Sequence, residues 1–174
     1  VIMAISKKLE DAINEQINAE IYSAYLYLSM AAYFDSINFG GFANWMKVQY
    51  QEEMSHAMKF YHFLDERGGR VLMKPIAGPE TSWESPIKVF EETYAHECTV
   101  TGLINKLMDL AIEERDHMAK ELLNWFIDEQ VEEESSADKI VNELKLIGDN
   151  GHGLLMIDRE LAARVFTPPA GEGA

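Results

Sequence analysis

Four glutamates and one histidine stand near the middle of long stretches with helical periodicity, on stripes that are otherwise largely apolar. They are Glu20, Glu53, His56, Glu97 and Glu133. Positions three or four residues apart share one face of a helix, so each glutamate is expected to point toward a core. A buried carboxylate without counter-charge is very costly, and such groups become neutral or bind cations. Because no lysine or arginine interrupts these stripes, the pattern predicts a pair of divalent or trivalent metal ions.

The two halves of the chain repeat this arrangement with one spacing. In each half a lone glutamate is followed 33 residues later by a pair spaced i, i+3. The lone residue and its pair are Glu20 with Glu53 and His56 in the first half, and Glu97 with Gln130 and Glu133 in the second. Di-iron carboxylate bundles use a Glu on two helices and Glu-x-x-His on two others. The first half matches this pattern fully, whereas the second has Gln and Glu at the paired positions.

The stripes require helices, and glycine and proline indicate where the helices end. The periodicity predicts helices at about 6–36, 41–67, 86–114 and 117–147, with a short fifth at about 153–164. Ser85-Pro86 predicts an N-cap and a first helical residue. Roughly 18 residues join the second and third helices, which is enough to run the length of a bundle. We therefore predict a single all-α domain over residues 1–174, a four-helix bundle with one long crossover and a short C-terminal fifth helix.

The composition restricts the partners of this domain. The chain has 174 residues and a net charge of -15, which should repel nucleic acid and anionic membranes and attract cations. No apolar run reaches the length of a membrane span, so we expect neither a nucleic-acid nor a membrane partner. Cys98 is the only cysteine, which excludes a disulfide within one chain and fits a cytoplasmic protein.

Several longer strings make the pattern more specific. They are NAEIYSAYLYLSMAAYF, FANWMKVQYQEEMSHAMKFY, YAHE and WFIDEQVEEES. With them the chain resembles the non-haem ferritins of archaea and bacteria, from Met3 to about Pro169. The resemblance implies iron storage and detoxification by a cytoplasmic homo-24-mer, and a ferroxidase that oxidises Fe(II) with O2 or peroxide at a di-iron centre within each subunit. The ferric product would be deposited as a mineral inside the hollow shell.

The resemblance also implies roles for individual residues. The first iron would be bound by Glu20, Glu53 and His56, with Glu53 bridging to the second iron. Glu97 and Glu133 would bind the second iron, with Gln130 beside it. A third iron would be held by Glu52, Glu129, Glu132 and Glu133. Tyr27 matches a tyrosine that supplies an electron during oxygen reduction in the family, and Trp125 matches a neighbouring tryptophan.

Other classes remain open at this point. A bacterioferritin would carry a second Glu-x-x-His at 130–133, and haem is not expected here even though Met54 stands in the right sequence context. A soluble di-iron oxidase or peroxidase usually keeps both histidines, and a DNA-protecting mini-ferritin binds iron between subunits. The remaining alternative is a helical scaffold with a neutralised polar layer. From the residues alone, Glu52, Glu129 and Glu132 would be surface acids.

Four further residues have no role in the predicted site. Asp128 and Glu134 are expected to be solvated acids, because they lie off the apolar stripe of their helix. His96 has no partner at a ligand spacing, so we expect a surface or packing residue. Cys98 is expected to pack against its neighbours.

Overall fold

The computed structural model describes residues 4–169, which form five α-helices and no strand. The helices are α1 (Lys7–Ser36), α2 (Gly40–Glu66), α3 (Pro86–Glu113), α4 (His117–Ile147) and α5 (Gly151–Leu161). The all-α prediction is confirmed, and the four long helices end within one residue of the predicted bounds. Residues 1–3 and 170–174 of the predicted domain lie outside the described residues.

The side chains at the N-cap positions fix the starts of α1 and α4. The Ser6 hydroxyl accepts the Leu9 amide at 3.2 Å before α1, and Asp116 accepts the Ala119 amide at 2.9 Å before α4. Such bonds satisfy amides that have no partner within the helix. Ser85 does occupy the N-cap of α3, with Pro86 as the first helical residue, but its hydroxyl makes no capping bond.

The fifth helix differs most from its predicted bounds. Asn150 accepts the amides of His152 and Gly153 at 3.0 and 3.1 Å, so α5 begins at Gly151 instead of residue 153. Gly148, with φ of 55°, makes the break before it. The helix ends at Leu161 instead of residue 164, where the Asn44 amide group takes up the Leu161 carbonyl oxygen at 3.2 Å. The Asn150 side chain therefore sets the start of α5, and the Asn44 side chain of α2 sets its end.

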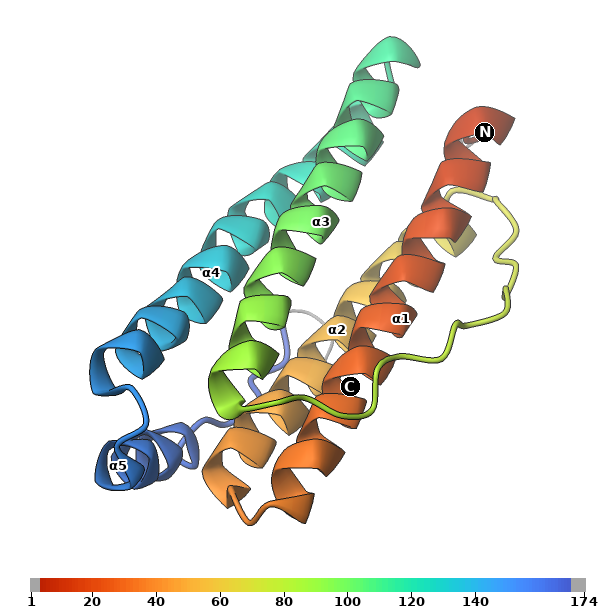
Figure 1. Cartoon of the computed structure of the whole chain (residues 1–174). Helices are drawn as coiled ribbons and strands as arrows, with labels where there is room; N and C mark the ends of the chain where they lie inside the picture. Colours follow the sequence, from red (N-terminus) through yellow and green to blue (C-terminus); the bar gives the residue numbers. More distant parts are fainter. Residues whose placement is uncertain (1–3, 170–174) are drawn as a thin grey trace.

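The helices form two antiparallel hairpins, α1 with α2 and α3 with α4, and α1 also packs on α3. A connection over residues 67–85 crosses from one end of the bundle to the other (Figure 1). It is fastened along α1, where Asn14, Asn18 and Ser29 donate to carbonyl oxygens of the connection at 3.0, 3.1 and 2.5 Å. The predicted long crossover is thus present. In the described residues, no helix is long and apolar enough to cross a membrane.

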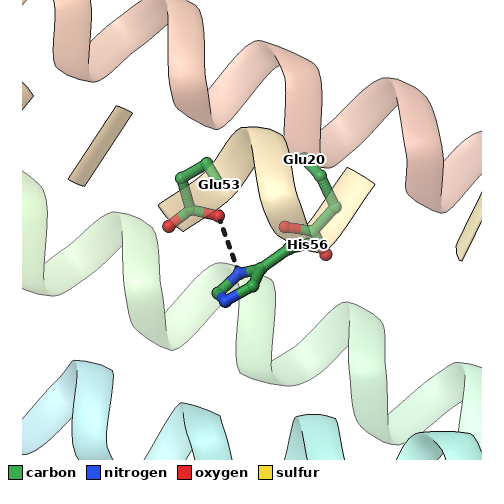
Figure 2. A group of neighbouring side chains, drawn as sticks. All are labelled: Glu20, Glu53 and His56. Carbon is green, nitrogen blue, oxygen red and sulfur yellow. Dashed lines mark ion pairs between the residues drawn. The ribbon is translucent and has the colours of Figure 1, made fainter. Parts of the chain in front are cut away.

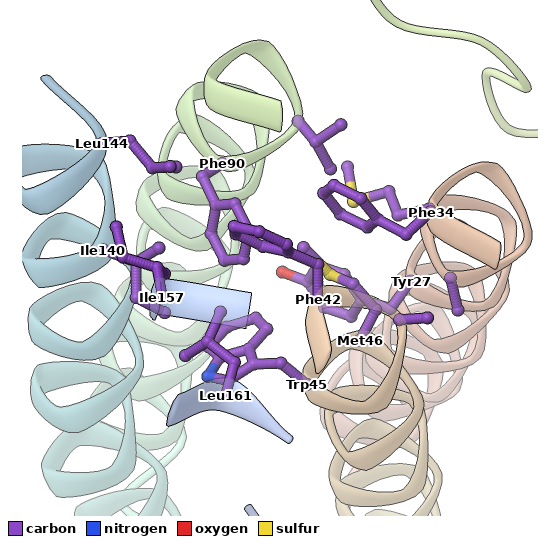
Figure 3. Packing of buried hydrophobic residues seen from close by; sticks show 14 of the residues in the cluster. Tyr27, Phe34, Phe42, Trp45, Met46, Phe90, Ile140, Leu144, Ile157 and Leu161 are labelled. Atoms are coloured by element: carbon purple, nitrogen blue, oxygen red, sulfur yellow. The ribbon is translucent and has the colours of Figure 1, made fainter. Parts of the chain in front are cut away.

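The hydrophobic core is divided into two clusters. One includes Phe34, Phe42 and Phe90, and Figure 3 shows it beside the C-terminal helix. The other is centred on Phe60 and Phe126, whose rings stack with centroids 4.0 Å apart. The two apolar clusters lie toward the two ends of the bundle, and the polar residues of the four stripes lie between them.

The fifth helix is attached to the start of α2. Asp158 accepts the amides of Gly41 and Phe42 at 2.8 and 3.0 Å. It supplies the cap that Phe39, at the N-cap position, does not provide, and its negative charge suits the positive end of a helix dipole. A Cβ on Gly41 would lie only 1.6 Å from the Asp158 carbonyl oxygen, so glycine is required for this approach.

Candidate metal centre

A polar layer lies between the two apolar clusters, with contributions from all four long helices. Its members are at most 5 % exposed and are Glu20, Gln49, Glu53, His56, Glu97, Gln130 and Glu133. Each stands near the middle of its helix, and mid-helix positions of antiparallel hairpins share one level. The structure therefore brings together every residue predicted for the di-iron centre, and adds Gln49.

Two groups in this layer are of the right size for a cation. Glu20, Glu53 and His56 offer ligand atoms that lie within 4.8 Å of one another, and Figure 2 shows them converging from α1 and α2. The carboxylates of Glu53, Glu97 and Glu133 satisfy the same limit. Glu53 belongs to both groups, and it is the residue for which the resemblance implies a bridging role.

A third group only partly matches the predicted third site. His56, Glu129 and Glu133 again lie within 4.8 Å, with Glu129 Oε1 3.9 Å from His56 Nε2. The other two predicted residues do not join it. Glu52 forms an ion pair with Arg164 from the segment after α5, and Glu132 is exposed to solvent. The four predicted residues therefore do not form one group. Glu52 is paired with a distant segment of the chain, and Glu132 lies on the solvent-facing side of α4.

Amide groups are turned toward the buried carboxylates as donors. Gln16 donates to Glu20 at 2.7 Å. Gln49 donates to Glu133 and, at 3.5 Å, to Glu53. These bonds compensate part of the lost hydration of buried anions. The sequence prediction assigned no role to Gln16 or Gln49, although Gln49 stands on the stripe of its helix, one turn before Glu53, and was detectable as a polar residue in an apolar position.

A second network holds Glu97 in place. The Gln130 amide nitrogen donates to Glu97 Oε2 at 3.2 Å and to Thr101 Oγ1 at 3.1 Å. Tyr27, which is fully buried, donates its hydroxyl to Glu97 Oε1. Both oxygens of Glu97 are therefore oriented before any cation arrives. Tyr27 lies in direct contact with a carboxylate of the centre, where the resemblance places it.

Aromatic rings confine the histidine of the centre. The centroids of Trp125 and Phe126 lie 5.5 and 5.7 Å from that of His56, both edge-on. Glu53 Oε2 lies 3.3 Å from His56 Nδ1, so the ring is held between a carboxylate and two apolar walls. Trp125 is thus a neighbour of the centre, as predicted.

The layer is electrostatically poised for cations. Burial raises the pKa of Glu97 to about 7 and that of Glu133 to about 8, and the nearby Glu97 carboxylate adds to the shift of Glu133. Burial and then Glu97 also raise the pKa of Glu53 well above its usual range. Without cations, carboxyl groups of the layer therefore hold protons near neutral pH. A cation bound in the layer would supply the missing counter-charge and displace those protons.

Three side chains outside the layer test the other expectations. His96 packs as expected, with Nε2 2.8 Å from Ser23 Oγ, and burial lowers its pKa to about 4. Cys98 was expected to pack but is exposed. Glu134 was expected to be solvated but is partly buried and accepts the Thr101 hydroxyl at 2.5 Å. Both errors arise because the periodicity of one helix does not reveal which neighbour lies alongside it.

The donor set fits iron. Carboxylate oxygens are hard ligands and imidazole is a borderline ligand. This combination suits iron better than it suits the metals that prefer thiolates. The sulfur of Cys98 lies outside every cation-sized group in the described chain.

Comparison with known proteins agrees with this geometry. A family model for the ferritin-like domain matches residues 10–147. The bacterial non-heme ferritin of Bacteroides fragilis (strain 638R) is 45% identical over 160 residues, which cover 92% of this chain and 99% of that protein. The bacterial non-heme ferritin of Staphylococcus saprophyticus is 41% identical over 162 residues, covering 93% and 97%.

Solved ferritin structures also resemble this chain over nearly its whole length. A ferritin of the archaeon Archaeoglobus fulgidus, engineered into a closed form, superposes with a TM-score of 0.93 at 53% identity and covers 94% of this chain and 100% of that one. The open pore ferritin of the same organism gives a TM-score of 0.92 at 53% identity, with coverage of 92% and 98%. This chain therefore belongs to the ferritin family.

Proposed function

We propose that the polar layer is a ferroxidase centre, and that the chain stores iron as a ferric mineral inside a cytoplasmic shell of 24 copies of itself. Iron storage follows from membership of the ferritin family. One observation supports the oxidation step above all: Glu53 is shared by two buried, cation-sized groups. Two Fe(II) ions bound there would be adjacent, and together they could deliver two electrons to one oxidant.

The roles of the side chains follow from their positions. Glu20 and His56 would bind the first ion, Glu97 and Glu133 the second, and Glu53 both. Each Fe(II) gives up one electron, and O2 takes up the two electrons with two protons as hydrogen peroxide. The protons that binding displaces from Glu97 and Glu133 are released next to the place where O2 is reduced. Hydrogen peroxide could instead take up the two electrons with two protons, and it would be reduced to two water molecules.

The ligand set favours release of the product over its retention. Carboxylates can change between terminal and bridging modes, and the second group contains no histidine. Gln130 donates hydrogen bonds to Glu97 and Thr101, and we propose that it positions the second site in addition to lying beside the iron. A bacterioferritin or a soluble di-iron oxidase would be expected to have a second histidine at this point.

Tyr27 would serve the centre as a nearby reductant. Burial and the Glu97 carboxylate raise the pKa of its phenol well above the usual range, so the side chain remains neutral and keeps its hydrogen bond to Glu97. Loss of an electron from Tyr27 would pass the phenolic proton along that bond to the carboxylate. The residue is therefore placed to supply an electron and a proton together.

Aerobic addition of Fe(II) to the apoprotein tests the proposal. Ferric absorbance follows oxidation, and gel filtration follows the size and solubility of the particle. A ferritin should oxidise hundreds of irons per shell and remain soluble. Saturation at two irons per chain without a mineral would instead indicate a soluble di-iron oxidase. Oxidation that is absent, or is equal in wild type and Glu53→Ala, would contradict a ferroxidase at this centre.

A further inference from the structure

Arg164 lies three residues beyond α5 and returns to the surface of α2. The Asn44 amide donates to the Arg164 carbonyl oxygen at 2.9 Å, which fixes the backbone there. The guanidinium stacks on the buried Trp45, with its central carbon 4.4 Å from the ring centroid. One nitrogen donates to Gln49 Oε1 at 2.8 Å, and the other forms an ion pair with Glu52.

These contacts follow one face of α2 toward the metal centre. Trp45, Gln49 and Glu52 are spaced four and three residues apart and so lie on one side of the helix. Glu53 directly follows Glu52 in the sequence, and His56 lies about one turn further along α2. The guanidinium is thus held by stacking and by two hydrogen-bonded partners immediately beside the polar layer, although its side chain remains 24% exposed.

Glu52 lies beside the third cation-sized group. The Arg164 guanidinium contacts both Glu52 and Gln49, and the Gln49 amide donates to Glu133 of that group. Yet Glu52 is not a member of the group of His56, Glu129 and Glu133, and its carboxylate is paired with Arg164. While Glu52 Oε2 is paired with the guanidinium, the carboxylate cannot bind a metal ion through both of its oxygens.

Arg164 also acts on the centre through Gln49. Its bond to Gln49 Oε1 fixes which end of the amide faces inward. The amide nitrogen is then the group that meets Glu133 and Glu53. Without the guanidinium, the amide could rotate and bring its oxygen to the carboxylates. The same side chain therefore positions two α2 residues around the centre.

We propose that Arg164 is a positioning residue that competes with a cation for Glu52, and so controls when a third cation binds beside His56, Glu129 and Glu133. A ferric ion that leaves the di-iron centre toward Glu52 would have to displace the guanidinium. The inference rests on the proposed function, because it assumes that cations occupy the centre.

Zn²⁺ titration of the apo-shell by calorimetry tests the competition without any redox step. Arg164→Ala should still bind two Zn²⁺ ions per chain at the di-iron centre and should strengthen a third by at least about tenfold, because the Glu52 carboxylate is freed to join the ligands of that third ion. Arg159→Ala is the matched control, since it removes the same charge from an exposed position on α5. Gel filtration checks that each variant forms the wild-type particle.

Two further variants make the result specific. Arg164→Gln removes the charge but keeps an amide that can stack and donate, so it should also strengthen the third site even if Arg164→Ala fails to assemble. In a Glu52→Gln background, Arg164→Gln should have no effect on the third ion. An unchanged third affinity in assembled Arg164→Gln, or an equal gain in Arg159→Ala, would overturn the inference while two tight ions still supported the proposed function. Failure of the wild type to bind two ions would instead contradict both.

Discussion

The α1–α2 hairpin carries a complete cation-sized group of its own, whereas the α3–α4 hairpin does not. Glu20, Glu53 and His56 all come from the first hairpin. Within residues 4–169, Glu97 enters such a group only together with Glu53, and each group that contains Glu133 also needs an α2 residue from the other hairpin. The first site therefore depends on the packing of one hairpin, and the second on how the two hairpins dock. We expect two ions that bind in sequence and with unequal affinity.

Glu53→Ala should disrupt both cation sites, so that the difference in affinity between them disappears. The substitution deletes the carboxylate that the two groups share and leaves two incomplete sets of ligands. Because changes even in residues around the ligands cost about 10–100-fold in affinity or activity, loss of this ligand should slow Fe(II) oxidation by at least about 100-fold. Stopped-flow ferric absorbance measures the rate. Glu66→Ala, an exposed acid at the end of the same helix, should behave as wild type.

Glu97→Gln should separate the two sites. The ligands of the first hairpin remain intact, so one tight Zn²⁺ per chain should persist, while the second should weaken roughly 10–100-fold. His56→Ala should weaken the first site instead and leave the carboxylates of the second group in place. Calorimetric stoichiometry distinguishes the two patterns. Equal loss of both ions in both variants would show that the hairpins do not act as separate units.

The pH dependence of the apoprotein should reflect the buried acids. Glu97 and Glu133, with pKa values of about 7 and 8, keep protons in the folded state that the unfolded chain has lost. The free energy of unfolding should therefore fall as pH rises from 6.5 to 8, by about 1 kcal/mol for Glu97 and about 2 kcal/mol for Glu133.

His96 has the opposite effect. Burial lowers its pKa to about 4, so the unfolded chain binds the proton more readily, and the free energy of unfolding rises with pH, but only below about pH 6.5. Thermal unfolding of the apo-shell between pH 6.5 and 8 therefore isolates the acids. Glu133→Gln should flatten the decline, and saturating Zn²⁺ should remove it. A decline of equal slope in Glu133→Gln would assign the effect to other groups.

The smallest expected effect concerns the docking of the hairpins at one end of the bundle. Arg67 after α2 forms two hydrogen bonds with Asp116 before α4, at 2.9 and 2.8 Å, and this contact lowers the pKa of Asp116. Arg67→Ala should lower the melting temperature by roughly 2–6 °C. It should also weaken the second Zn²⁺ more than the first. Arg70→Ala, which removes an exposed positive charge, is the matched control and should change neither.

The helices and the polar layer could be predicted because periodic spacing within one helix determines which side chains face inward. Glu20, Glu53, Glu97 and Glu133 follow that rule, and all are buried. Contacts between distant segments leave no such signal. The pairing of Glu52 with Arg164, 112 residues away, and the cap that Asp158 gives to α2 arise only when α5 folds back onto the bundle. This is why the side chains predicted to bind two irons lie close together in the core, whereas those predicted for a third iron do not form one group.

The most direct test of the centre is iron anomalous diffraction from crystals soaked with Fe(II) under anaerobic conditions. The proposed centre predicts two iron peaks per subunit within the polar layer, one beside Glu20 and His56 and one beside Glu97 and Glu133, with the Glu53 carboxylate bound to both. Iron confined to surface acids, or a single buried peak that does not contact Glu53, would contradict it.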